Sequence, residues 1–117
     1  MVKLINECGC ISIASEVFTI LTGDAATNCF GVKGMTVRSV SDGLVHLLKK
    51  ESMGKGVHIT YNEDNSISIK LHIAVDQGVN IPVICDSIID RVRYQVTEGT
   101  GVEVRRIDIY VDSMLIG

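Results

Sequence analysis

Aromatic residues and proline are scarce in this 117-residue chain, which has no Trp, 2 Phe, 3 Tyr and 1 Pro. Its core must therefore be aliphatic, and 15 Val and 15 Ile, the β-branched residues favoured in strands, can supply it. Hydrophobic residues make up 46% of the chain and charged residues 21%, which excludes the composition of a disordered protein. At this length we expect one domain over residues 1–117.

Long apolar runs are also missing. No run approaches the roughly 18 residues that a transmembrane helix requires, and the apolar stretch before Asn6 is too short for a secretory signal. We therefore expect a cytoplasmic protein with reduced cysteines and no membrane span. The net charge of -3 argues against nucleic acid as the default partner, because such partners usually require a concentrated basic face.

The first half of the sequence predicts a strand followed by two helices. An apolar run at residues 10–13 is typical of a strand, and Ser15 then suits a helix N-cap. One buried helical stripe is expected up to about Gly31, formed by Val17, Ile20, Leu21, Ala25 and Cys29. Residues 35–40 are ambiguous, whereas Ser41 and Asp42 before the apolar residues 44–48 predict a short second helix.

The second half predicts a hairpin, a long helix and a final strand. Residues 57–61 and 67–75 alternate between apolar and polar side chains and are joined by a polar turn, as in an antiparallel hairpin. Pro82 marks the start of a helix that ends at Gly99 and Gly101. Its expected apolar stripe is Ile81, Ile84, Cys85, Ile88, Ile89, Val92 and Val96.

The alternation of the last strand contains a fault. Val102 and Val104 are out of phase with Ile107, Ile109 and Val111, so we expect a bulge at Arg105-Arg106 that keeps both groups on one face.

These elements most simply form a two-layer α+β fold, with the helices on one face of a small mixed β-sheet and the last helix as a crossover. The other face of the sheet would be largely open, and Ala74 is one of the residues expected on it. We take four residues of this face as a candidate interaction surface: Thr60, Ser68, Lys70 and His72. Charges protect the last strand, so we expect a homo-oligomer to form at residues 10–13, at residues 57–61, or across the open face.

The cysteines give a weak metal signal. Cys8 and Cys10 could point the same way on a strand, but a structural zinc site needs a second ligand pair. Cys29 and Cys85 fall instead on apolar helix stripes, where free Cys acts as a small hydrophobe. We therefore expect structural thiols and no metal.

No catalytic group stands out either. His58 and His72 could face each other across the hairpin, yet no third ligand lies nearby in the sequence. Asp86 and Asp90 are one helical turn apart, which is typical of a solvated face. No phosphate-binding loop, dinucleotide fingerprint or nucleophile motif is present. We expect no enzyme, no cofactor and no catalytic residues.

One motif supports a rival hypothesis. Gly31-Val32-Lys33-Gly34 matches the G-x-x-G loop with which KH modules grip a nucleic-acid backbone. Under that alternative Gly31, Lys33 and Gly34 would form the loop, supported by a basic face of Lys33, Arg38, Lys49, Lys50 and Lys55. A helix C-cap followed by a turn explains the same glycines, and the negative net charge favours that interpretation.

Several segments together resemble the bacterial alkaline shock protein family, also called the envelope stress response family, whose members include Gls-type general stress proteins. The matching segments, in order, lie at residues 9–17, 26–35, 56–57, 67–82 and 100–111, so that the resemblance covers about residues 9–111. It implies a small non-catalytic cytoplasmic protein, common in Gram-positive bacteria, linked to envelope stress. It also implies self-association and a protein partner, membrane-anchored in some members, that holds the protein at the inner face of the membrane.

Overall fold

The computed structural model describes residues 1–38 and 44–116, and within them the chain forms seven strands, two α-helices and one 3-10 helix. In chain order these are β1 (Val2–Asn6), β2 (Gly9–Ile13), α1 (Ser15–Thr27), β3 (Val32–Arg38), β4 (Val45–Leu47), the 3-10 helix η1 (Lys50–Gly56), β5 (Val57–Tyr61), β6 (Ile67–Asp76), α2 (Ile81–Thr100) and β7 (Val104–Leu115).

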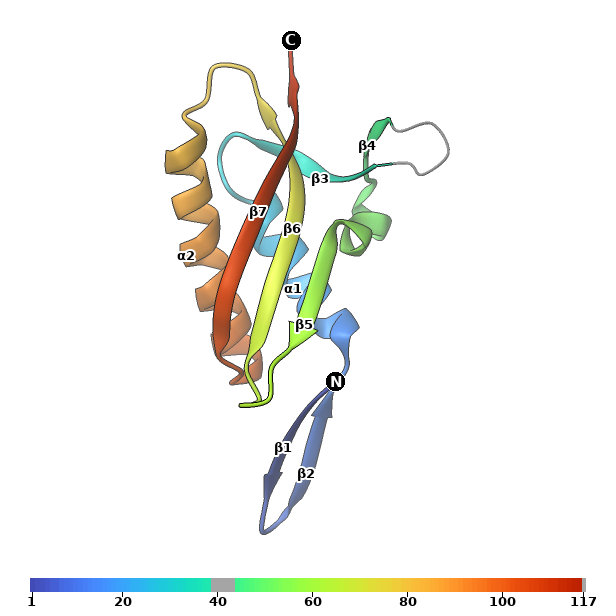
Figure 1. Cartoon of the computed structure of the whole chain (residues 1–117), viewed down its shortest axis with the longest axis vertical. Coiled ribbons are helices and arrows are strands. Elements are labelled where there is room, and N and C mark those ends of the chain that lie inside the picture. Colours follow the sequence, from blue (N-terminus) through green and yellow to red (C-terminus); the bar gives the residue numbers. More distant parts are fainter. Residues whose placement is uncertain (39–43, 117) are drawn as a thin grey trace.

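Strand β6 is the centre of a five-stranded mixed sheet (Figure 1). One of its edges pairs with β7 in parallel over its whole length, and α2 makes the crossover between them. Two antiparallel strands share its other edge. Strand β5 pairs with residues 67–71 of β6 and β3 pairs with residues 73–75 of β6, while β4 pairs with β3. The predicted mixed sheet and hairpin are confirmed, and β6 is central as its composition indicates.

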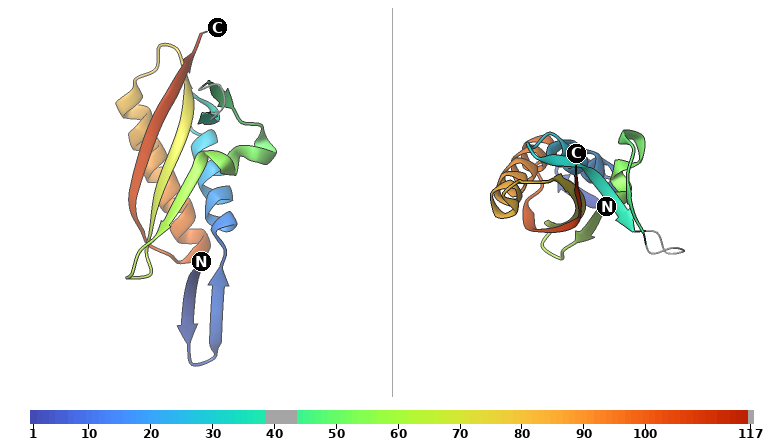
Figure 2. Two further views of the ribbon diagram at one scale, coloured as in Figure 1. Left: turned by 45° about the vertical axis from the view of Figure 1, so that its right-hand side comes forward. Right: turned by 90° about the horizontal axis from the view of Figure 1, so that it is seen from above.

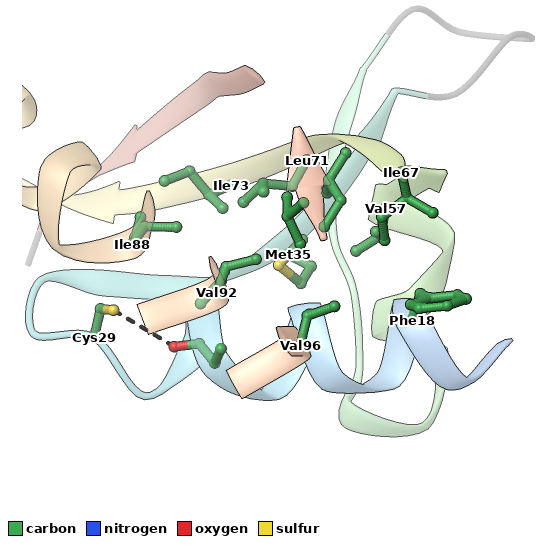
Figure 3. Packing of buried hydrophobic residues seen from close by; sticks show 14 of the residues in the cluster. Phe18, Cys29, Met35, Val57, Ile67, Leu71, Ile73, Ile88, Val92 and Val96 are labelled. Atoms are coloured by element: carbon green, nitrogen blue, oxygen red, sulfur yellow. Dashed lines mark hydrogen bonds between the residues drawn. The ribbon is translucent and has the colours of Figure 1, made fainter. Parts of the chain in front are cut away.

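Both α-helices cover the same face of this sheet, which confirms the two-layer α+β fold (Figure 2). Between the layers lies an almost wholly aliphatic core (Figure 3). Strand β6 contributes Ile67, Ile69, Leu71 and Ile73, all fully buried. Helix α2 faces them with Ile84, Ile88, Val92 and Val96, the centre of the predicted stripe.

The termini of α2 also follow from the sequence. The Asn80 side chain accepts a hydrogen bond from the backbone N–H of Val83, and Pro82 lies in the first turn, where it interrupts no helical hydrogen bond. Gly101 ends the helix in the left-handed conformation, with φ of 74°.

Strand β7 contains the predicted bulge. Ile67 pairs with Val104 and Ser68 with Arg106, so that Arg105 is an extra residue on β7. As a result Val104 and Ile107 both pack against the core. A second register shift, at Asp112, was not expected from the sequence. Near it Ala74 is buried, so it is not part of an open surface as expected.

The predicted stripe of helix α1 is confirmed in its second half and wrong in its first: Ala25 and Cys29 are buried and Leu21 packs against the core. Its N-cap is Ala14, without a side-chain hydrogen bond, and not Ser15. Phe18 is fully buried, whereas Val17 and Ile20 are exposed. Because the helix is apolar on several sides, periodicity alone does not determine which side faces the core. Burial of the Phe18 ring, the largest side chain of the helix, determines it.

The predicted short helix at residues 44–48 is wrong. Residues 45–47 form β4, which pairs with residues 36–38 of β3, and η1 follows it. Cross-strand pairing with β3, 7 to 11 residues earlier in the chain, decides the structure of so short an apolar run. The expected caps Ser41 and Asp42 lie outside the described residues.

The N-terminal residues form a separate two-stranded ribbon, β1 and β2, that extends from the body along its long axis (Figure 1). The strand expected at residues 10–13 is therefore real, but it does not border the main sheet. Val2 anchors the ribbon in the core, and Asn65 of the β5–β6 turn donates to the backbone oxygen of Lys3. Ile5 and Ile11 are exposed.

Candidate interaction surface on the open sheet face

The sheet face opposite the helices carries polar and ring side chains from three strands. Alternation along β6 directs its apolar side chains to the helices and the intervening ones outward. Cross-strand pairing arranges the outward side chains of β5, β6 and β7 in three rows: Thr60, Ser68 and Arg106; His58, Lys70 and Asp108; and His72 with Tyr110. The four residues predicted from the sequence, Thr60, Ser68, Lys70 and His72, thus lie together on one face.

His72 is the most constrained of these side chains. Its Nδ1 lies 2.9 Å from Oδ2 of Asp112, and the Thr36 hydroxyl donates to the same oxygen at 3.0 Å. Thr36 is buried in β3, so the carboxylate joins side chains of three strands. Because a carboxylate only accepts hydrogen bonds, Nδ1 of His72 carries the proton. In the neutral imidazole, Nε2 then keeps a lone pair.

Two further rings contact His72. Tyr110 stacks on it, with ring centroids 4.8 Å apart and planes inclined by 14°. His58 meets it edge to face, with centroids 5.8 Å apart and planes at 90°. The predicted approach of His58 and His72 across the hairpin is therefore confirmed. A pocket of about 290 Å³ lies beside them, and its lining is Thr36, Val37, Lys55, His58, His72 and Asp112.

Sequence reasoning missed Thr36, Tyr110 and Asp112 as members of this cluster. The alternation of β7 could have placed Tyr110 and Asp112 on the open face, since both are even-numbered and the core residues from Ile107 are odd-numbered. Nothing in the sequence gives the parallel register that brings Asp112 to His72, 40 residues away.

The cysteines divide into two groups. Cys8 and Cys10 are exposed on the N-terminal ribbon, whereas Cys29 is buried and its thiol donates to the backbone oxygen of Ala25. Burial raises the pKa of the Cys29 thiol, partly opposed by Arg91, and burial together with Asp86 raises the pKa of Cys85. All four cysteines are free.

No group of three or more His, Cys, Asp or Glu side chains in the described ranges has the arrangement of a metal site. Asp86 and Asp90 are both exposed on α2, consistent with a solvated face.

The G-x-x-G segment has a structural role. Val32, Lys33 and Gly34 belong to β3, and Lys33 forms an ion pair with Asp76 at 3.2 Å. Gly31 has φ of 88°, and a Cβ there would lie 2.5 Å from Cδ1 of Ile84. The segment therefore joins α1 to the sheet by close packing, and we find no support for the KH-like alternative.

Four of the five Phe and Tyr side chains are exposed, although the core could have used them. Only Phe18 is fully buried, and its ring meets that of Tyr61 edge to face. Tyr110 lies on the open face. Phe30, 93% exposed, and Tyr94 instead line a groove of about 750 Å³ along α2. Exposed aromatic side chains are enriched at protein interfaces.

Among the described residues, no helix has both the length and the apolar character required to cross a bilayer.

Comparison with known proteins identifies the family. Residues 3–116 match the alkaline shock protein 23 family, which is described as having a cell envelope-related function. The uncharacterized protein YloU of Bacillus subtilis is 31% identical over 116 residues, covering 98% of this chain and 96% of YloU. An uncharacterized Streptococcus pyogenes protein is 29% identical over 98% of this chain and 95% of its own length.

The uncharacterized protein YqhY of B. subtilis is 30% identical over 106 residues, covering 91% of this chain and 77% of YqhY. No solved structure matches the chain. The match over nearly all residues agrees with the resemblance in the sequence motifs, and the chain belongs to the alkaline shock protein 23 family, whose function is related to the cell envelope.

Proposed function

We propose that this protein is a non-catalytic interaction protein within the envelope-related function of its family. It self-associates and binds protein partners at the cytoplasmic side of the membrane, and its contact surface is the open sheet face. The observation that carries the proposal is the uncovered face itself, with its ordered rings of His72 and Tyr110. Because these rings are already fixed, less side-chain entropy is lost on binding than with flexible side chains.

The charges on this face also suit contact between two copies. Lys70 and Asp108 are cross-strand neighbours, so the face presents both signs side by side. In an isologous dimer the same face meets itself, and a mixed-charge face can then pair opposite charges across the two-fold axis. A face of one sign would repel its copy.

The test is the oligomeric state of the full chain. Light scattering at tens of micromolar should give a mass above the 12.7 kDa of a monomer. Lys70→Glu removes the positive charge from the middle row of the open face and should return the protein to a monomer. Arg93→Glu makes the same change on the exposed side of α2 and should leave the oligomer intact.

A strict monomer in the unmodified protein would contradict self-association. An oligomer that survives both Lys70→Glu and Thr60→Glu would exclude the open face as its interface.

A further inference from the structure

We propose that His58 and His72 form a binding site for a divalent transition-metal ion, with Asp112 as the residue that orients His72. A single chain supplies every protein ligand, so the site does not rest on the proposed self-association, although His72 belongs to the same open face. Imidazole nitrogens suit zinc, copper and nickel, and a single chain would supply two of them. Water or another ligand would complete the coordination.

The orientation of His72 is the first argument. Metal-binding histidines usually donate their second ring N–H to a carboxylate, which fixes the tautomer and makes the free nitrogen a better ligand. Nδ1 of His72 donates in this way to Asp112, and the Thr36 hydroxyl holds the carboxylate from the other side. Stacking on Tyr110 further fixes the ring plane. The arrangement therefore leaves Nε2 of His72 as the available nitrogen.

The spacing of the two rings is the second argument. With a zinc–nitrogen bond of about 2.1 Å and the ring centre about 1.1 Å behind the nitrogen, two imidazoles on a tetrahedral zinc have centres about 5 Å apart. The centroids of His58 and His72 are 5.8 Å apart. Because the two rings meet edge to face, metal binding requires the exposed His58 side chain to rotate until one of its nitrogens points at the same ion as Nε2 of His72.

The surroundings contain one charge of each sign. Asp112 favours a cation in the pocket, whereas the ammonium of Lys55, which also lines it, opposes one. Lys55 is exposed at the end of a long side chain and can turn into solvent, while Asp112 is held by two hydrogen bonds. The fixed charge of the pocket is thus negative, which favours a cation over an anion.

Zinc titration of the full chain tests the proposal. The titrated protein carries Cys8→Ser and Cys10→Ser, because these exposed thiols would compete for zinc. Calorimetry should show zinc binding, and ring-nitrogen NMR should show shifts at His58 and His72. His58→Ala should weaken binding at least 10-fold and Asp112→Asn by about 10- to 100-fold, the range for residues that orient metal ligands. His46→Ala, on β4, is the matched control and should bind zinc normally.

Lys55→Ala separates a cation site from an anion site, since it should strengthen zinc binding. Inorganic phosphate should shift neither histidine. Zinc affinity that is unchanged by His58→Ala, or zinc-induced shifts at His46 in place of His58 and His72, would overturn the proposal. So would phosphate binding that depends on Lys55 in the absence of any zinc response.

Discussion

Gly31 and Gly78 offer a matched test of how tightly the two layers pack. Both have a positive φ, 88° and 86°, so an alanine at either position adopts the left-handed conformation, at a cost of about 1–2 kcal/mol. The atoms that an added Cβ would meet differ between the two positions. A Cβ on Gly78 would meet nothing within 4 Å, whereas one on Gly31 would lie 2.5 Å from Cδ1 of Ile84 and 3.0 Å from Cγ1 of Val79.

We therefore expect Gly31→Ala to cost more stability than Gly78→Ala. The excess is the price of overpacking, about 1–3 kcal/mol. It should lie toward the lower end, because the atom nearest the new Cβ is the end of an isoleucine side chain. Urea unfolding followed by circular dichroism gives both values as free energies of unfolding, and the Gly78 variant removes the backbone contribution from the comparison.

Ile84→Val gives the second half of this test, since it deletes the clashing Cδ1. In the unmodified protein it should cost about 0.5–1.5 kcal/mol. In the Gly31→Ala background it should cost less, or restore stability, because it relieves the overlap. Equal losses for Gly31→Ala and Gly78→Ala, or an Ile84→Val effect that is the same in both backgrounds, would refute the packing argument.

Three other predictions follow from single contacts. The hydroxyl and the backbone N–H of Ser66 donate to Asp64 and lower the pKa of its carboxyl. The resulting stabilisation is present above the pKa of Asp64 in the unfolded chain, and it is lost as the pH falls through the pKa of Asp64 in the folded chain. Asp64→Asn should accordingly reduce the pH dependence of stability below about pH 4 in acid titrations, and an unchanged profile would contradict this. A disulfide-exchange reagent should modify Cys8 and Cys10 rapidly and Cys29 and Cys85 slowly until denaturant is added, because burial raises the pKa of the latter two; four equally fast thiols would disprove it. Deleting Arg105 should lower the free energy of unfolding by under about 1 kcal/mol, since Val104 and Ile107 stay in phase. Deleting Arg105 and Arg106 together should lower it by several kcal/mol, because each buried aliphatic side chain contributes about 1.5–3 kcal/mol. Equal losses of stability in thermal melts would disprove the bulge argument.

The parts of the fold that sequence reasoning predicted depend on local signals. The β5–β6 hairpin has strict alternation on both sides of a five-residue polar turn, residues 62–66, so its register is nearly fixed by neighbours in the chain. Asn65 even takes the positive φ, 69°, that such turns favour. The bulge at Arg105 could be inferred because the fault in alternation lies within one strand.

The buried face of helix α1 was predicted in part wrongly because it depends on distant contacts. Helix α1 could have buried Val17 and Ile20, but Phe18 instead meets Tyr61 of β5. On the same helix, Gly23 leaves room for Met53 of η1, which would lie 3.1 Å from a Cβ there. Neither partner is near α1 in the sequence. Residues 44–48 were assigned to the wrong class for another reason: their pairing partners in β3 are near in the sequence, but residues 35–40 lack the clear alternation that would predict a hairpin.

The candidate site shows most sharply how one extra residue in a strand can create a feature that no motif reveals. Ile73 pairs with Val111 and Ala74 with Ser113, so Asp112 is the unpaired residue of the second register shift. Bulges re-aim side chains, and here the carboxylate of Asp112 reaches both His72 and Thr36. In the sequence Asp112 indicated only a charge that protects an edge strand. In the folded chain it fixes the ring of His72, and the proposed metal site depends on that contact.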